Sequence, residues 1–197
     1  AVTITADILA ADDNGISTDA AVGNNAALTI AGALADGGSV TLSNARKVTI
    51  TSAGDDSGIS FTIVGTDING TAQTESLTGA DTGVATSSKF FLTIASITAV
   101  GDPAANVKAG ISADSSSIVY SGRSRLKGVF LTSTATAGTV DFLNTSTAGT
   151  SLMKISSVAS ATATRDVVIP ENGVLFTDGI YIQYTVSTFL TLTVFHA

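Results

Sequence analysis

The chain has 197 residues, of which 44% are hydrophobic and 13% are charged, and its formal net charge is −7. Because it contains no cysteine, neither disulfides nor thiolate metal sites are possible. No basic stripe of the kind that binds nucleic acid is present, and no window of about 18 residues is free of polar groups, as a membrane-spanning helix requires. The start, "AVTITADILAADD", lacks the basic residues and apolar block of a signal peptide.

The composition predicts an all-β fold. The chain has 30 Thr, 23 Ser and 19 Gly but only 2 Pro, and the branched side chains of Thr, Val and Ile pack well on a pleated sheet. We predict two small antiparallel β-sandwich or barrel modules, preceded by an extended N-terminal arm.

Residues 1–36 are expected to form the arm and one or two short strands. Val2, Ile4 and Ile8 fit one side of a strand, but the Asp, Asn and Gly residues that follow interrupt it. A short helix around "ISTDAAV" is an alternative. Arms of this kind often become ordered only against a neighbour.

Residues 37–113 are predicted to form the first β module. Apolar and polar residues alternate in "SVTLS", "KVTITS" and "GISFTIVG", whereas the more polar "TAQTESLTG" is typical of an edge strand. The run "FFLTIASITAV" is apolar on both sides, which fits a strand covered on both faces or one bent across two sheets. Stretches such as "AGDDSG" and "TDINGT" are rich in turn formers.

Residues 114–197 are predicted to form the second β module. A Ser-rich connector, "GISADSSSIVYSG", precedes six or seven strands that include "RLKGVFLTS", "GTVDFLN" and "LTLTVFHA". The boundary is expected between residues 112 and 118, and the Asn-Gly pair of "PENG" favours a turn with positive φ.

Asp55 and Asp56 raise the question of carboxylate chemistry. Paired acids that act as general acid and base need burial or mutual repulsion to separate their pKa values. "SAGDDSG" lies between two well-patterned strands, which favours a chain-reversing turn; a weak calcium site and a catalytic pair are the alternatives.

A stretch of acidic residues and a single histidine are two further candidate sites. "DDNGISTD", from Asp12 to Asp19, begins like a calcium loop, but the EF-hand pattern fails after Asn14. His196 is the only histidine, too little for a zinc site or for a creditable Ser-His-Asp triad. We therefore expect no catalytic residue, no metal ligand and no cofactor, and hence no enzyme.

The basic cluster "GRSRLKG" contains Arg123, Arg125 and Lys127. Their spacing of two predicts one face of a strand. A solvated outer face is the simpler interpretation, and a contact with an acidic partner is the alternative. Residues 1–115 carry 12 acidic and four basic side chains, so most of the negative charge lies outside this region.

The segment Ala45–Val100, "ARKVTITSAGDDSGISFTIVGTDINGTAQTESLTGADTGVATSSKFFLTIASITAV", resembles a widespread family of tailed-phage virion proteins. Residues 122–195 are similar, less specifically, to small phage structural proteins in "GRSRLKGV", "GTVDF", "IPENGVLFTDGIY" and "LTVF". The resemblance does not reach the residues before Ala27. It implies a non-enzymatic β protein of the virion with no shared catalytic residue.

The expected function is that of a capsid decoration (cement) protein on the outer surface of a tailed-phage head. The expected partners are the major capsid protein and further copies of the chain, most simply a homotrimer. Its candidate contact residues are Val2, Ile4, Ile8, Leu9, Arg123, Arg125 and Lys127. The alternatives are a neck, tail or fibre component, including a receptor-binding module, and a carbohydrate-binding or carbohydrate-active sandwich, which the absence of Trp disfavours.

Overall fold

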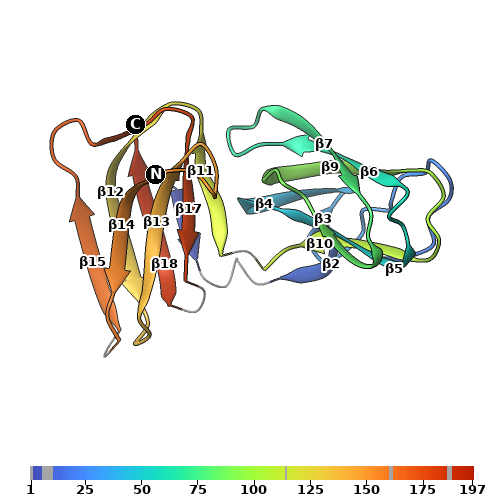
Figure 1. The fold of residues 1–197 in the computed structure, drawn as a ribbon, viewed down its shortest axis with the longest axis horizontal. Helices are drawn as coiled ribbons and strands as arrows, with labels where there is room; N and C mark the ends of the chain where they lie inside the picture. Colours follow the sequence, from blue (N-terminus) through green and yellow to red (C-terminus); the bar gives the residue numbers. More distant parts are fainter. Residues whose placement is uncertain (1, 6–10, 114, 160–161, 186–187) are drawn as a thin grey trace. The chain divides into compact units, whose positions relative to one another are not determined.

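The computed structural model describes residues 2–5, 11–113, 115–159, 162–185 and 188–197 (Figure 1). Over these residues the secondary structure is strands and turns without a helix, and all strand pairings are antiparallel, which confirms the all-β fold. The chain divides into two compact units. We call Ala11–Asp114 the first sandwich, and Ala1–Ala10 with Ser115–Ala197 the second sandwich.

The first sandwich contains two sheets. The four-stranded sheet has the order β2-β10-β5-β8, with the bounds Asp12–Ala20, Val107–Ile111, Val48–Asp55 and Asp81–Thr86. The five-stranded sheet has the order β3-β4-β9-β6-β7, with the bounds Ala35–Asp36, Ser39–Arg46, Phe91–Val100, Ser60–Thr66 and Ala72–Thr78. The polar strand β7 lies at the edge of its sheet, as predicted.

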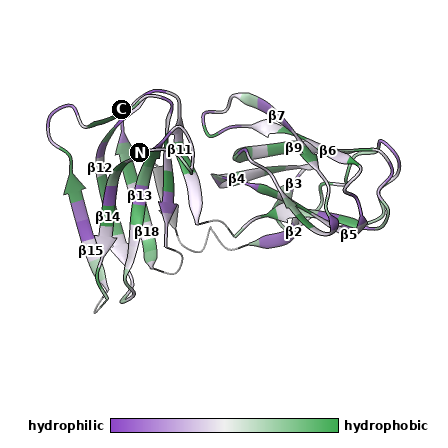
Figure 2. Ribbon diagram, viewed as in Figure 1, coloured by the Kyte–Doolittle hydropathy of each residue, from purple (hydrophilic) through white to green (hydrophobic). Residues whose placement is uncertain are grey.

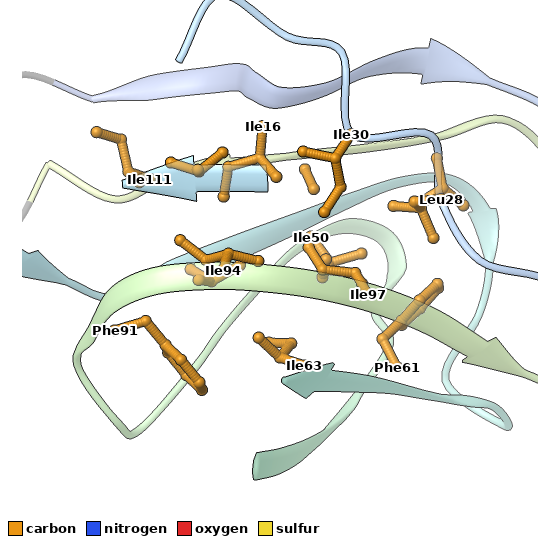
Figure 3. Packing of buried hydrophobic residues seen from close by; sticks show 14 of the residues in the cluster. Ile16, Leu28, Ile30, Ile50, Phe61, Ile63, Phe91, Ile94, Ile97 and Ile111 are labelled. Carbon is orange, nitrogen blue, oxygen red and sulfur yellow. The ribbon is translucent and has the colours of Figure 1, made fainter. Parts of the chain in front are cut away.

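The core of the first sandwich is filled from both sheets. Ile50 and Val107 extend from one sheet, and Phe61, Ile63 and Ile97 extend from the other; all five are fully buried. Figure 3 shows these isoleucine and phenylalanine side chains converging between the strands. The alternation of "KVTI" and "ISFTI" therefore produces two facing apolar layers.

Strand β9 departs from regular alternation. The register with β6 shifts between Val64 and Gly65, where one strand residue, Ala95, is left without a partner. This bulge brings both Ile94 and Ile97 into the core although their spacing is odd. Gly65 is required here, because a Cβ atom would collide with the carbonyl oxygen of Thr93.

Residues 11–36 belong to the first sandwich, which differs from the expectation of an arm that ends at residue 36. Ile16 on β2 is fully buried, and Leu28 and Ile30 pack in the same core. The amide of Leu28 donates a hydrogen bond to the carbonyl of Ile97, 2.8 Å away. Residues 12–20 form a strand and not the alternative helix, because β10 supplies backbone partners along β2.

The second sandwich is also built from two sheets. One has the order β1-β18-β12-β15, with the bounds Val2–Thr5, Phe189–His196, Ser124–Ser133 and Ala163–Val168, and β16 (Val174–Phe176) also pairs with β12. The other has the order β11-β17-β13-β14, with the bounds Ser116–Ser121, Gly179–Tyr184, Gly138–Asn144 and Ser151–Ser157. Val129 and Leu131 face Val140, Phe142 and Ile182 in the shared core. Figure 2 shows hydrophobic and hydrophilic segments interleaved along the strands of both sandwiches.

The first strand of the chain belongs to the second sandwich. Val2 and Ile4 are the register partners of Val194 and Leu192 on β18. The segment expected as a single arm thus divides between residues 10 and 11, and its described N-terminal part is an edge strand. The boundary between the two sandwiches follows Asp114, which lies within the expected range of residues 112–118.

Replacing Phe61 with Ala tests the core of the first sandwich. Phe61 is fully buried, and removing a buried phenylalanine ring costs about 3–5 kcal/mol. We expect the free energy of unfolding of the first sandwich to fall by that amount. Denaturant unfolding, monitored by hydrogen exchange of residues 11–113, measures it. Val64→Ala on the same strand, where the side chain is 37% exposed, serves as the control, and an equal effect of both variants would contradict the assigned core.

Candidate functional site

Asp55 is an exposed turn residue at the end of β5. Its Oδ1 accepts hydrogen bonds from the Ser57 hydroxyl at 2.6 Å and from the Ser57 amide at 3.1 Å. These hydrogen bonds hold the pKa of Asp55 below its ordinary value. The geometry is that of an Asx turn, which uses the carboxylate to reverse the chain.

Asp56 differs from its neighbour because it is only 1% exposed. Its Oδ1 accepts a hydrogen bond from the Ala104 amide at 2.8 Å, which ties this corner to the loop that precedes β10. Its backbone amide donates to the carbonyl of Ala80. The two acids therefore point to different partners, and the arrangement organises the corner.

The acidic stretch 12–19 lies on β2 and not in a loop. Asp13 forms an ion pair with Lys108 on β10, and Asp19 Oδ2 accepts from Asn106 Nδ2 at 3.3 Å. Within the described ranges, no group of three or more His, Cys, Asp or Glu side chains is placed to hold a metal ion. The carboxylates of Asp13 and Asp19 instead bind side chains on or near the neighbouring strand.

His196 is half-buried at the end of β18. Its ring lies 5.1 Å from the Tyr120 ring, centroid to centroid, and its Nδ1 is 3.4 Å from the Ser124 hydroxyl oxygen. Burial lowers the pKa of His196 below its ordinary value. The ring is therefore neutral at neutral pH and has a packing role.

The predicted basic cluster is divided by its local structure. Arg123 is exposed and precedes β12, whereas Arg125 and Lys127 lie on that strand. Arg125 Nη1 donates to the Asn172 carbonyl at 3.2 Å, and Lys127 Nζ donates to the Glu171 carbonyl at 3.3 Å. The two strand residues hold the 170–173 turn against β12, and they remain partly exposed.

Large apolar side chains are exposed beside these two cations. On the outer side of the β1-β18-β12-β15 sheet, Phe130 is 38% exposed, Phe195 44% and Val168 76%. Val168 and Phe195 are both register partners of Gly128, and Phe130 follows two residues later on β12. We call the five residues Arg125, Lys127, Phe130, Val168 and Phe195 the β12 surface.

The β12 surface is shaped by the absence of a side chain at Gly128. A Cβ atom there would lie 3.7 Å from Phe195 Cδ2, so the phenylalanine ring reaches over the glycine backbone. An alanine at this position would meet the ring at contact distance and the Val167 carbonyl oxygen at 3.0 Å. The apolar side chains of the surface thus come from three neighbouring strands, β15, β12 and β18.

The sequence-based prediction missed Phe130, Val168 and Phe195, although a signal for them exists. Each follows an apolar neighbour whose side chain faces the core side of the sheet, in the doublets "VF", "VV" and "VF". Since successive side chains on a strand point to opposite faces, one member of each doublet must lie outside. Three such doublets in one register indicate an apolar outer patch.

The remaining predicted contact residues are at the N-terminus. Val2 and Ile4 lie on β1, at register positions opposite two core residues of β18. Ile8 and Leu9 lie outside the described residues. Their role in contacts with other subunits remains a prediction.

Two hollows of about 220 Å³ each lie on the second sandwich. One is lined by Ser115, Thr139, Asp141, Gln183, Tyr184 and Thr185. The other is lined by Arg123, Ser124, Arg125, Leu175 and Ala197. Both are smaller than typical ligand pockets, which enclose about 300–1,000 Å³.

Comparisons with family models, curated proteins and solved structures returned no match for this chain. The described residues also contain no helix that is long and apolar enough to cross a membrane. What this chain binds is therefore inferred from the surfaces of its two sandwiches.

Substitution of Asp56 distinguishes a structural from a chemical role. Asp56→Ala removes the acceptor of the buried Ala104 amide, and an unpaired buried donor costs about 1–3 kcal/mol. Asp56→Asn retains an oxygen for that amide, and its NH₂ takes the place of Oδ2, which makes no hydrogen bond in the described structure. We expect thermal unfolding to show a larger loss of stability for Asp56→Ala than for Asp56→Asn. Equal losses of stability would contradict the hydrogen bond to Ala104 as the source of the stabilisation.

Proposed function

We propose that this protein is a structural component of a tailed-phage virion, a decoration protein that binds the outside of the head lattice as a homo-oligomer, with a trimer as the expected state. The single observation that carries the proposal is the β12 surface, a sheet face that exposes three large apolar side chains beside two cations, with Asp166 as the register partner of Phe130. The resemblance of Ala45–Val100 and of residues 122–195 to phage virion proteins supplies the biological setting.

The chemistry of the β12 surface fits a protein partner. Phe130, Val168 and Phe195 offer apolar area that becomes buried on contact, and aromatic residues and arginine are enriched in interface cores. Arg125 and Lys127 border this area with positive charge, so the partner is expected to present an apolar patch flanked by carboxylates. The major capsid protein is the proposed partner.

The charge distribution of the chain supports a two-part role. Residues 11–114 carry 11 acidic and four basic side chains, whereas residues 1–10 and 115–197 together carry five of each. A neutral sandwich with a cationic border suits attachment to the shell. An acidic sandwich suits exposure to solvent, where like charges keep particles apart.

A decoration protein and a neck or tail component differ in their expected copy number per particle. A decoration protein covers a repeating lattice and is present in hundreds of copies per particle, whereas a neck or tail component is present in about six or twelve copies, because of ring symmetry. Quantitative gel densitometry of purified particles, with the major capsid protein as the internal standard, separates the two. A low copy number would exclude decoration of the head.

Substitution of Phe130 tests the β12 surface. Phe130→Asp places a charge in the proposed interface and should weaken binding to heads that lack the protein at least tenfold, since central apolar residues carry most of the binding energy. Sedimentation of heads with bound protein measures the effect, and thermal unfolding checks that the variant is folded.

Val84→Asp is the matched control for Phe130→Asp. Val84 is 58% exposed on β8 of the first sandwich, away from the β12 surface in sequence and in sheet. It should leave head binding unchanged. Binding by Phe130→Asp at the wild-type level would contradict the assignment of this surface.

A further inference from the structure

The second sandwich is assembled from two pieces of chain that are far apart in sequence. Its first strand, β1 (Val2–Thr5), is separated from its next strand, β11 (Ser116–Ser121), by the whole first sandwich. Among the described residues, no other strand of the second sandwich comes from before Ser115. β1 is therefore joined to its own sheet by non-covalent pairing across a long connection.

In the described structure, β1 pairs with a single strand, β18. It lies at the end of the order β1-β18-β12-β15, and its register with β18 runs from Val2 opposite Val194 to Thr5 opposite Thr191. On the other side of β18, β12 is paired along nearly its whole length. Removing β1 would leave the backbone donors and acceptors of β18 open along one edge.

An unpaired β18 edge would bind other extended strands. Leu192 and Val194 are at most 3% exposed, so β18 is a central, apolar strand. Exposed edges of such strands pair with any compatible strand. The β1 sequence "VTIT" contains only β-branched residues, which favour the extended conformation.

We propose that β1 exchanges between copies of this protein, so that residues 2–5 of one copy pair with β18 of a second copy in the same register. The exchanged pairing uses the same backbone hydrogen bonds as the internal one, so no new interface has to evolve. This is the condition under which domain swapping is a low-cost route to an oligomer.

The balance between internal and exchanged pairing depends on concentration. Internal pairing is favoured by an effective concentration on the order of millimolar for a tethered segment. Exchange becomes competitive when the local concentration of other copies approaches that value. Because the inference rests on topology alone, it is independent of the proposed function and can be tested with the purified protein.

The absence of cysteine makes disulfide trapping specific. Thr3 and Thr193 are register partners across β1 and β18, and directly opposed residues lie within the Cα distance that a disulfide spans. Two single variants of the full-length chain, Thr3→Cys and Thr193→Cys, are mixed, unfolded, refolded together and oxidised. We expect a disulfide-linked dimer that joins the two different variants, with a yield that rises about severalfold when the protein concentration is raised about 50-fold.

A second pair of variants provides the matched control. Thr132 and Thr191 are register partners on β12 and β18, both within the contiguous segment 115–197. The mixture of Thr132→Cys and Thr191→Cys should give no linked dimer above the level of either variant alone. Peptide mapping of the linked species distinguishes the two introduced cysteines.

The double variant Thr3→Cys/Thr193→Cys tests whether the β1–β18 register allows a disulfide within one chain. If it closes within one chain while the mixed single variants give no more dimer than the control pair at either concentration, β1 does not exchange and the proposal is overturned. If the double variant forms no disulfide in any form, the β1–β18 register itself is wrong and the proposal also fails. A failure of head binding would leave these results untouched and would count only against the proposed function.

Discussion

Both sandwiches depend on burying inward-facing side chains between two sheets. Each fully buried Ile or Phe contributes about 1.5–3 kcal/mol relative to an exposed one, and neither disulfides nor metal clusters of the described residues supplement this term. The rule that successive side chains point to opposite faces decides which residues contribute. The β12 surface follows from the same rule, since Phe130, Val168 and Phe195 lie on the faces that the core does not use.

Much of the fold could be predicted wherever strands are regular. Val48, Ile50, Phe61 and Ile63 follow strict alternation and lie in the core as predicted. For β9 the prediction left open whether the strand is covered on both faces or bends across two sheets, and Ile94 and Ile97 both lie in the core. The bulge at Ala95 shifts the alternation, and it depends on the close approach of Gly65 to β9, which no local pattern reveals.

Other parts of the fold could not be predicted because they depend on pairing between residues that are far apart in the sequence. The residues around Ile16 appear irregular in sequence because a strand with two register shifts pairs them with β10, about 90 residues later. The burial of Asp56 depends on the distant Ala104 amide. Adjacent acids in a turn give no local signal of which one will face inward. For the candidate site, the basic residues could be predicted, but their contacts with the 170–173 turn and the apolar patch beside them required the register of three strands.

The position of β1 also has a consequence for synthesis of the chain on the ribosome. Residues 2–5 are made long before their partner β18, which spans Phe189–His196. At about 5–20 residues per second, the first strand waits roughly ten to forty seconds for its partner. The first sandwich, whose segment is contiguous, can form during this interval. The second sandwich can close only after β18 has been made, so nascent chains on one message expose unpaired VTIT segments to each other.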